Sequence, residues 1–152
     1  MTVDILDKPM PAAAAAIATA FSHIHESDKP WRSDGLRDFF LYKDLGIAEA
    51  TNGQVIAQLV KANLAPEEGT GWHRHEAKFH IVIMLKGWAR FMYETKETLV
   101  KAGDTVHQRP GITHYLFDYS PDMEYLEIVS PADFTSLEVE GPCDIPAATP
   151  WK

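Results

Sequence analysis

Short runs of alternating or continuous apolar residues dominate the chain from Leu36 onward. Each run is about four to nine residues long and is bounded by Gly, Pro, Asn or Asp, which is typical of β-strands separated by turns. Many short strands without intervening helices favour an all-β sandwich or barrel over a parallel α/β sheet. We predict strands over residues 38–43, 54–64, 70–75, 79–86, 88–94, 97–101, 104–108, 113–118 and 123–129, with one further short element opening at Asp133-Phe134.

The first 35 residues do not share this pattern. Residues 1–10 are predicted to be an extended arm. The alanine-rich stretch 11–25 predicts a short N-terminal helix, because alanine is the strongest helix former and the Asp28-Lys29-Pro30 cluster would end it. The expected organisation is therefore an N-terminal arm and helix (1–35), one barrel (36–140) and a C-terminal tail (141–152).

The composition is that of an ordinary globular protein, with 45% hydrophobic residues, 24% charged residues and a formal net charge of -8. An acidic chain without a basic run repels phosphate backbones and anionic headgroups, so nucleic acid is not an expected partner. No apolar run approaches the roughly 20 residues that span a bilayer, and Asp4 and Asp7 in the leader do not suit a signal peptide. The single cysteine, Cys143, fits a reducing compartment, so a cytoplasmic location is expected.

Three histidines, His73, His75 and His80, fall within a short stretch of the chain. Alternate residues of a strand share a face, so His73 and His75 would point the same way and could bind one metal together. His80 heads the next strand, where both faces are apolar and a buried imidazole needs partners for its nitrogens. His114 follows in a second glycine-punctuated stretch. We predict that these four histidines form one metal site inside the barrel.

Residues 69–118 resemble the two sequence motifs of the cupin superfamily. In the first motif, a His-x-His pair is followed by four residues, a glutamate, six residues and a glycine. His73, His75 and Gly87 match this motif, and His80 occupies the glutamate position. The second motif begins with Gly-Asp, reaches a Pro-x-Gly turn and ends two residues later on histidine. It is matched by Gly103-Asp104, Gly111 and His114, with Arg109 at the proline position and Asp118 where the family has an asparagine.

The resemblance implies a jelly-roll-like cupin double-sheet β-barrel and, because small cupins usually dimerise, a homodimer. It assigns metal-ligand roles to His73, His75 and His114, but not to His80, where the family has a carboxylate. We predict His80 as a fourth ligand or as a group close to the ligands. The alternative is a neighbouring pocket histidine that binds the substrate or a ligand water.

A site of neutral imidazoles suits one divalent transition metal, with Fe(II) favoured and Mn, Zn, Ni and Cu as alternatives. Without the carboxylate of the family, the metal would keep its full positive charge and favour an anionic or enolisable small-molecule substrate. Glu76 or Glu127 could restore a carboxylate from elsewhere. Protons compete for imidazole nitrogens, so we expect metal release as the pH falls through about 6.5.

Phe91, Tyr93 and Arg109 are predicted to line the substrate pocket. By analogy with cupin hairpins, Phe91 and Tyr93 face inward, with a purely structural core role as the alternative. Arg109, at the mouth of the second motif, could attract an anion or pair with a neighbouring acid. His107 is expected to be a barrel histidine rather than a pocket residue, and the second His-x-His pair, at residues 23–25, is expected on the surface.

A resemblance to all-histidine cupin dioxygenases favours a mononuclear non-haem iron dioxygenase that cleaves a small dicarbonyl-like substrate with O2. Two alternatives remain open. One is a non-oxidative isomerase or lyase in which the metal acts as a Lewis acid. The other is a module that binds a small molecule without turnover. The fold alone does not choose between them.

Overall fold

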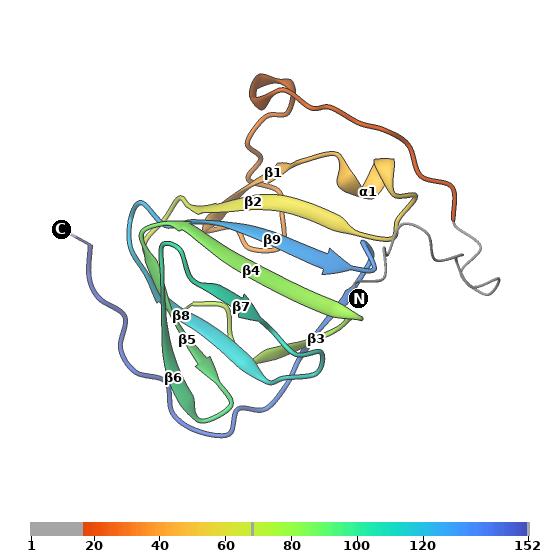
Figure 1. Cartoon of the computed structure of the whole chain (residues 1–152). Coiled ribbons are helices and arrows are strands. Elements are labelled where there is room, and N and C mark those ends of the chain that lie inside the picture. The colour runs from red at the N-terminus through yellow and green to blue at the C-terminus, as the bar shows by residue number, and fades with distance from the viewer. Residues whose placement is uncertain (1–16, 68, 152) are drawn as a thin grey trace, which may run out of the picture.

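The computed structural model describes residues 17–67 and 69–151, whose strands form two antiparallel sheets facing one another (Figure 1). The sheets are five-stranded, with the orders β1-β2-β9-β4-β7 and β10-β3-β8-β5-β6. This arrangement confirms the predicted all-β, double-sheet, jelly-roll-like barrel. In chain order the elements are η3 (Glu26–Asp28), β1 (Phe40–Asp44), α1 (Ile47–Ala50), β2 (Ile56–Ala62), β3 (His73–Glu76), β4 (Phe79–Lys86), β5 (Trp88–Tyr93), β6 (Lys96–Lys101), β7 (Thr105–His107), β8 (His114–Tyr119), β9 (Glu124–Ser130) and β10 (Thr135–Glu138).

The predicted strands each overlap one of β1 to β9. The largest offset is at β3, which was predicted to begin at residue 70 and begins at His73. The element predicted to open at Asp133-Phe134 is β10, which pairs with β3. The short helix α1 was not predicted, because four residues carry too little periodic pattern to stand out.

The predicted helix over residues 11–25 is wrong for residues 17–25, which contain no helix; residues 11–16 lie outside the described part. A single 3-10 turn, η3, follows instead. The physical reason is the absence of a surface for the apolar side chains, since Phe21 is 94% exposed and Ile17 is 53% exposed. Alanine propensity without a packed face does not hold a short helix in water.

The core lies between the two sheets and follows from strict alternation along the strands. On β4, His80, Val82 and Met84 face inward and are buried, while the residues between them are half-buried on the outside. The turn from β4 to β5 depends on Gly87, which has a φ of 65°. A Cβ there would overlap the Ser120 side chain, so both the conformation and the space require glycine.

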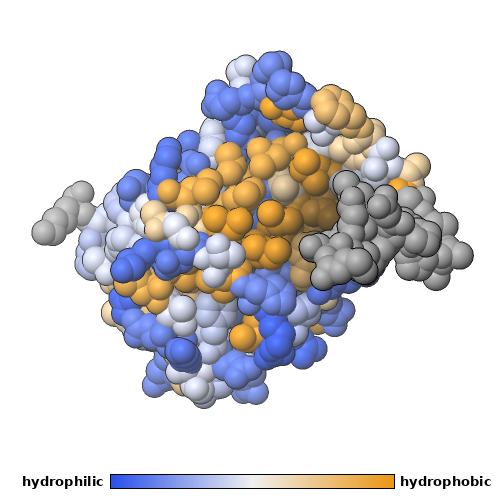
Figure 2. Space-filling view, viewed as in Figure 1, coloured by the Kyte–Doolittle hydropathy of each residue, from blue (hydrophilic) through white to orange (hydrophobic). Residues whose placement is uncertain are grey.

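The outer face of the β1-β2-β9-β4-β7 sheet is apolar. Ladder neighbours bring Leu59, Leu126 and Ile83 into one row, and Ile128 and Ile81 into the next. All five are half-buried. Figure 2 shows hydrophobic side chains gathered over this sheet, in the middle of the face that it presents. We call these five residues the outer apolar face.

Parts of the two segments that flank the barrel are bonded to it. Before β1, Arg32 forms a two-way backbone bridge with Tyr42. After β10, Thr149 bonds to Asp118 and the Trp151 indole donates to the backbone oxygen of Tyr119 at 3.2 Å. Among the described residues, no helix is long and apolar enough to cross a membrane.

Candidate metal centre

Three histidines converge at one end of the space between the sheets. His73 and His75 alternate on β3, where they are the buried residues of a buried-exposed-buried-exposed pattern. His114 opens β8 and is the ladder partner of His73. Each of the three offers a nitrogen that lies within 4.8 Å of the nitrogens of the other two. The predicted strand geometry of the His-x-His pair is therefore present, and His114 completes the cluster from the neighbouring strand.

The backbone orients two of these rings. The Nδ1 atom of His73 donates to the carbonyl oxygen of Gly71 at 2.8 Å, and Nδ1 of His114 donates to that of Ile112 at 2.9 Å. A carbonyl only accepts, so each Nδ1 carries the hydrogen and each Nε2 keeps its lone pair. Such bonds are the usual way in which a protein fixes the tautomer and ring direction of a metal-binding histidine.

The third ring, that of His75, has a buried Nδ1 atom without a hydrogen-bond partner in the described part of the chain. An unpaired buried nitrogen is unfavourable unless something else satisfies it. Together with the two oriented lone pairs, this makes the three-histidine cluster compatible with a single divalent metal.

All three rings are neutral at physiological pH. Burial lowers the pKa of His73 to about 4, of His75 to about 2 and of His114 to about 3. Burial is the largest cause of each shift, and the positive charge of Arg37 acts in the same direction on all three pKa values. Neutral imidazole is the form that binds a metal, so the site is held in its ligating state over the whole physiological range.

His80 has other partners in this structure. Its Nε2 lies 2.6 Å from Oε1 of Glu127, and its Nδ1 lies 3.3 Å from the Gln108 side-chain amide. Gln58 donates to the second oxygen of Glu127 at 2.8 Å. Both nitrogens of His80 are thereby engaged, although its ring centroid is only 4.9 Å from that of His75. His80 therefore lines the cavity beside the cluster with both nitrogens engaged, and its role as a fourth ligand stays a prediction.

Glu127 places a carboxylate beside His80, which stands at the glutamate position of the first motif. Burial by itself would raise the pKa of Glu127, but its hydrogen bonds with His80 and Gln58 hold that pKa below its ordinary value. The carboxylate is therefore ionised. Glu76, the other candidate, is exposed on β3 and points away from the cluster.

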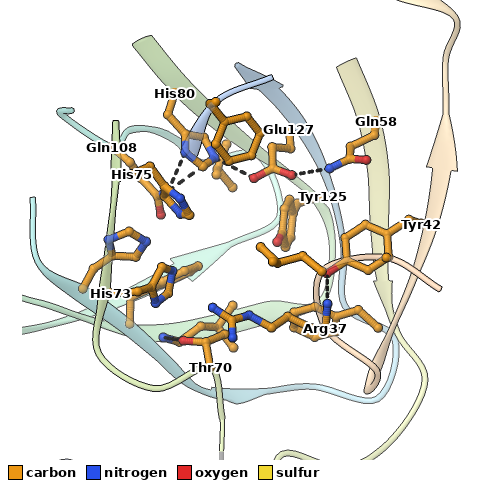
Figure 3. A pocket seen from close by; sticks show the side chains of 18 of the residues that line it. Arg37, Tyr42, Gln58, Thr70, His73, His75, His80, Gln108, Tyr125 and Glu127 are labelled. Atoms are coloured by element: carbon orange, nitrogen blue, oxygen red, sulfur yellow. Dashed lines mark hydrogen bonds and ion pairs between the residues drawn. The ribbon is translucent and has the colours of Figure 1, made fainter. Parts of the chain in front are cut away.

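A cavity of about 260 Å³ connects these groups (Figure 3). Its wall combines the four histidines with apolar side chains such as Val82, Phe91 and Phe134. Phe134 packs edge-on against His75, with ring centroids 5.4 Å apart. The volume is slightly below the roughly 300–1,000 Å³ of typical ligand pockets, so the cavity suits a small molecule.

The three residues predicted to line the pocket have different positions. Phe91 is in the cavity wall. Tyr93 stands behind it, stacked on Phe91 at 5.2 Å between ring centroids, and donates to the Gln108 oxygen at 2.7 Å. Arg109 is exposed, pairs with Glu94 and takes no part in the wall, which corrects its predicted place.

The remaining histidines lie outside the site. His107 is exposed at the end of β7, so it is neither a pocket residue nor a buried barrel histidine. His23 and His25 are exposed, as expected, and their rings lie 4.6 Å apart.

Sequence reasoning missed Arg37, Gln58 and Gln108. A signal existed for Gln58, because it is the single polar residue in the apolar run from Val55 to Val60. No such sequence signal pointed to Arg37, which lies before β1 in a segment without hydrophobic periodicity.

Residues 60–129 match the family described as "Cupin domain". Among solved structures, the polyketide cyclase RemF from Streptomyces resistomycificus is 14% identical with a TM-score of 0.61, covering 80% of this chain and 89% of that chain. KdgF from Halomonas sp. is 17% identical with a TM-score of 0.56, covering 72% and 94%. A predicted oxalate decarboxylase from Thermotoga maritima is 26% identical with a TM-score of 0.52, covering 60% and 80%. No curated protein matches the chain significantly.

The family match covers residues 60–129, which include β3 to β8, most of β9 and the part of the barrel that carries the histidine cluster. The likenesses to solved structures concern the fold.

Proposed function

We propose that this cupin is a metal-dependent enzyme that moves a proton on a small carbonyl-bearing substrate, as an isomerase or a lyase does. The observation that carries this proposal is the buried His80–Glu127 pair beside the three-histidine cluster. A site whose sole task was to bind a metal would not need a separate acid–base pair in the same cavity.

The hydrogen bonds of the pair support a different role for each of its two residues. Glu127 accepts the Nε2 hydrogen of His80, so the basic lone pair of His80 is on Nδ1, where only the Gln108 amide contacts it at 3.3 Å. This nitrogen takes a proton from a carbon next to the substrate carbonyl, and Glu127 stabilises the resulting imidazolium. Return of the proton to a different atom gives an isomer. Departure of a leaving group with the electron pair gives a lyase product. Neither route consumes an oxidant or a reductant.

A divalent metal held by His73, His75 and His114 would supply Lewis acidity toward the substrate carbonyl. The apolar side chains of Val82, Phe91 and Phe134 exclude water from the same space, which strengthens electrostatic interactions there. The likeness to a predicted oxalate decarboxylase, which is named for a lyase reaction, supports this class of chemistry.

The test is hydrogen–deuterium exchange followed by NMR. A panel of diketones and hydroxyketones is incubated with the metal-loaded protein in D2O under argon. We expect deuterium to enter at least one compound at the carbon next to its carbonyl. The exchange should be lost in His80→Gln and kept in His107→Gln, which changes an exposed histidine on β7. Turnover that requires O2 in every case would contradict the proposal.

The second candidate is the non-haem iron dioxygenase that the sequence favoured. Its supporting observation is the donor set of three neutral imidazoles, which suits Fe(II) as well as Mn, Ni, Cu and Zn. An oxygen electrode tests it with the same panel. Consumption of O2 in proportion to substrate by the Fe(II)-loaded protein would favour this candidate over the first. Saturable binding without any product would leave only the binding module. A cytoplasmic setting, expected from the lone Cys143, is part of both candidates.

We also propose that the protein forms a homodimer through the outer apolar face. Leu59, Leu126 and Ile83 form a continuous row there, flanked by Ile128 and Ile81. A contiguous apolar patch on a sheet surface is typical of a protein–protein interface. A second copy of the same chain offers a matching patch, as a two-fold symmetric contact requires.

A further inference from the structure

Arg37 enters the cavity from outside the part of the chain that matches the cupin family. It lies in the segment before β1, whereas the match begins at residue 60. Its backbone N–H donates to the Tyr42 hydroxyl at 3.0 Å, which fixes the segment against β1. Figure 3 shows the Arg37 side chain reaching from this anchor across the cavity toward His73. The guanidinium is thus on the opposite side of the cavity from His80 and Glu127.

Within residues 17–67 and 69–151, the Arg37 guanidinium has neither an ion pair nor a hydrogen bond, although the residue is half-buried. The acids of the same wall are already engaged. Asp34 pairs with Arg32 at the mouth of the cavity, and Asp44 caps the backbone N–H of Gly46 and faces Lys29. Glu127 belongs to His80 and Gln58. No acid of the described wall is left to neutralise Arg37.

Arg37 and the three clustered histidines line the same cavity. In Figure 3 the Arg37 side chain points toward His73, so the guanidinium and the histidine rings share one space. A metal ion there would add to the positive charge, and an anion is the group that relieves it.

We infer that Arg37 binds the carboxylate of the substrate, and that the substrate is a small carboxylic acid with a carbonyl or hydroxyl oxygen directed at the three-histidine cluster. This inference rests on the proposed function, since it concerns the same cavity. The guanidinium is a planar fork of donors that matches a carboxylate in a bidentate contact. The cavity of about 260 Å³ has room for such a small acid between Arg37 and His80. Under this inference Arg37, and not Arg109, is the residue that binds the anion.

Isothermal titration with three oxo acids and their neutral amides tests this role. The probes are pyruvate, acetoacetate and levulinate, each compared with its primary amide, because an amide keeps the planar shape and removes the charge. We expect at least one acid to bind wild-type protein about 10-fold or more tightly than its amide, the size of effect usual for a charge-assisted hydrogen bond. Arg37→Gln should bring that acid and its amide within about 3-fold of one another.

Two variants serve as controls. Arg37→Lys keeps the charge without the fork and should retain part of the preference for the acid. Arg109→Gln removes an exposed arginine that pairs with Glu94 and should retain all of it. Thermal unfolding of each variant checks that the barrel is intact. An undiminished preference in Arg37→Gln, or no preference in wild-type protein, overturns the inference.

The titration is repeated on metal-stripped protein, which separates this inference from the proposed function. A preference for the acid that persists without metal and depends on Arg37 upholds the carboxylate site, even if no proton exchange is found with any compound. The opposite outcome is also informative. If proton exchange is lost in His80→Gln but the preference for the acid is unchanged in Arg37→Gln, the proposed function is supported and this inference is wrong.

Discussion

The Nε2 atom of His80 on β4 lies 2.6 Å from Oε1 of Glu127 on β9, and both side chains are buried in the cavity beside the three-histidine cluster. The two strands are ladder neighbours, with Val82 opposite Glu127. The histidine that stands at the glutamate position of the first motif is therefore paired with a carboxylate from the neighbouring strand of the sheet.

Metal content distinguishes a ligand from a neighbour. His80→Gln should still bind about one metal ion per chain at saturation, with affinity reduced roughly 10–100-fold, as for a group that orients a ligand. His75→Gln removes one of the three convergent imidazoles and should leave no metal bound after gel filtration. Elemental analysis of the two variants measures this difference. Equal loss in both would make His80 the fourth ligand that the sequence predicted.

The role of Glu127 is separable from that of the metal site. Glu127→Gln keeps the size of the side chain and removes the charge that stabilises protonated His80. We expect the rate of proton exchange to fall by about 10²–10⁴-fold, the usual contribution of general acid–base catalysis. Metal content should not change. Glu76→Gln is the matched control, since Glu76 is exposed on β3 beside His75. A rate unaffected by Glu127→Gln would exclude the pair from the reaction.

The pH dependence of stability follows from the three depressed histidine pKa values. The unfolded chain takes up protons near the ordinary pKa of 6.5, whereas the folded chain holds His73 neutral to about 4, His114 to about 3 and His75 to about 2. The stability of metal-free protein is therefore fully present above pH 6.5 and falls as the pH drops toward 4. Each histidine contributes up to about 1.4 kcal/mol per pH unit in that window.

Urea unfolding of metal-free protein at pH values from 7.5 to 4.5 measures this slope. The variant His114→Asn should lose about a third of it, because one of three similar histidines is removed. His107→Asn should keep the full slope, since His107 is exposed. A flat profile between pH 6.5 and 5 would mean that the cluster is already protonated in the folded state.

Burial also changes the expectation for metal release. The sequence predicted loss of metal near pH 6.5, where free histidine protonates. Because the folded-state pKa values of the ligands are about 4 or lower, protons compete with the metal only at lower pH. We expect the metal to be retained at pH 6 and released together with unfolding at more acidic pH. Metal analysis after dialysis at each pH, compared with circular dichroism, checks whether the two events coincide.

The barrel could be predicted because its information is local. Alternation of apolar residues and Gly- or Pro-containing turns define each strand without reference to the rest of the chain. Two of the three clustered histidines could be placed for the same reason, since His73 and His75 are two residues apart on one strand. The predicted helix is absent from residues 17–25 because the stability of a helix depends on tertiary packing, which alanine content does not encode.

Other parts of the site depend on which strands become neighbours. Glu127 reaches His80 only because β9 pairs with β4, a relation that strand periodicity cannot give. The sign available in the sequence was a charged residue in the apolar run from Leu126 to Val129. The position of Arg37 is harder still to predict. Its backbone is anchored by a hydrogen bond to the Tyr42 hydroxyl, in a segment that has no hydrophobic periodicity.

The proposed dimer is tested by charging the outer apolar face. Ile83 lies in the row with Leu126 and points away from the core, so Ile83→Lys should fold normally. Burying an unpaired lysine at a dimer interface should raise the dissociation constant by about 30-fold or more, as for a central interface residue. Light scattering after gel filtration measures the mass. Leu99→Lys is the control, since Leu99 is 51% exposed on the other sheet. A monomeric wild-type protein would refute the proposal.

Asp118 gives a last prediction, because it replaces the asparagine that the cupin motif has at this position. It is fully buried, and its carboxylate accepts hydrogen bonds from Arg90 at 3.0 Å and from the hydroxyl of Thr149 at 2.8 Å. In Asp118→Asn an amide nitrogen must face one of these donors, so we expect a loss of about 1.5–3 kcal/mol in the free energy of unfolding and faster proteolysis of the C-terminal tail. Urea unfolding and timed digestion measure the two effects, with exposed Asp133→Asn as the control. Unchanged stability in Asp118→Asn would mean that the tail is held by the Trp151 contacts alone, because those contacts do not involve the carboxylate.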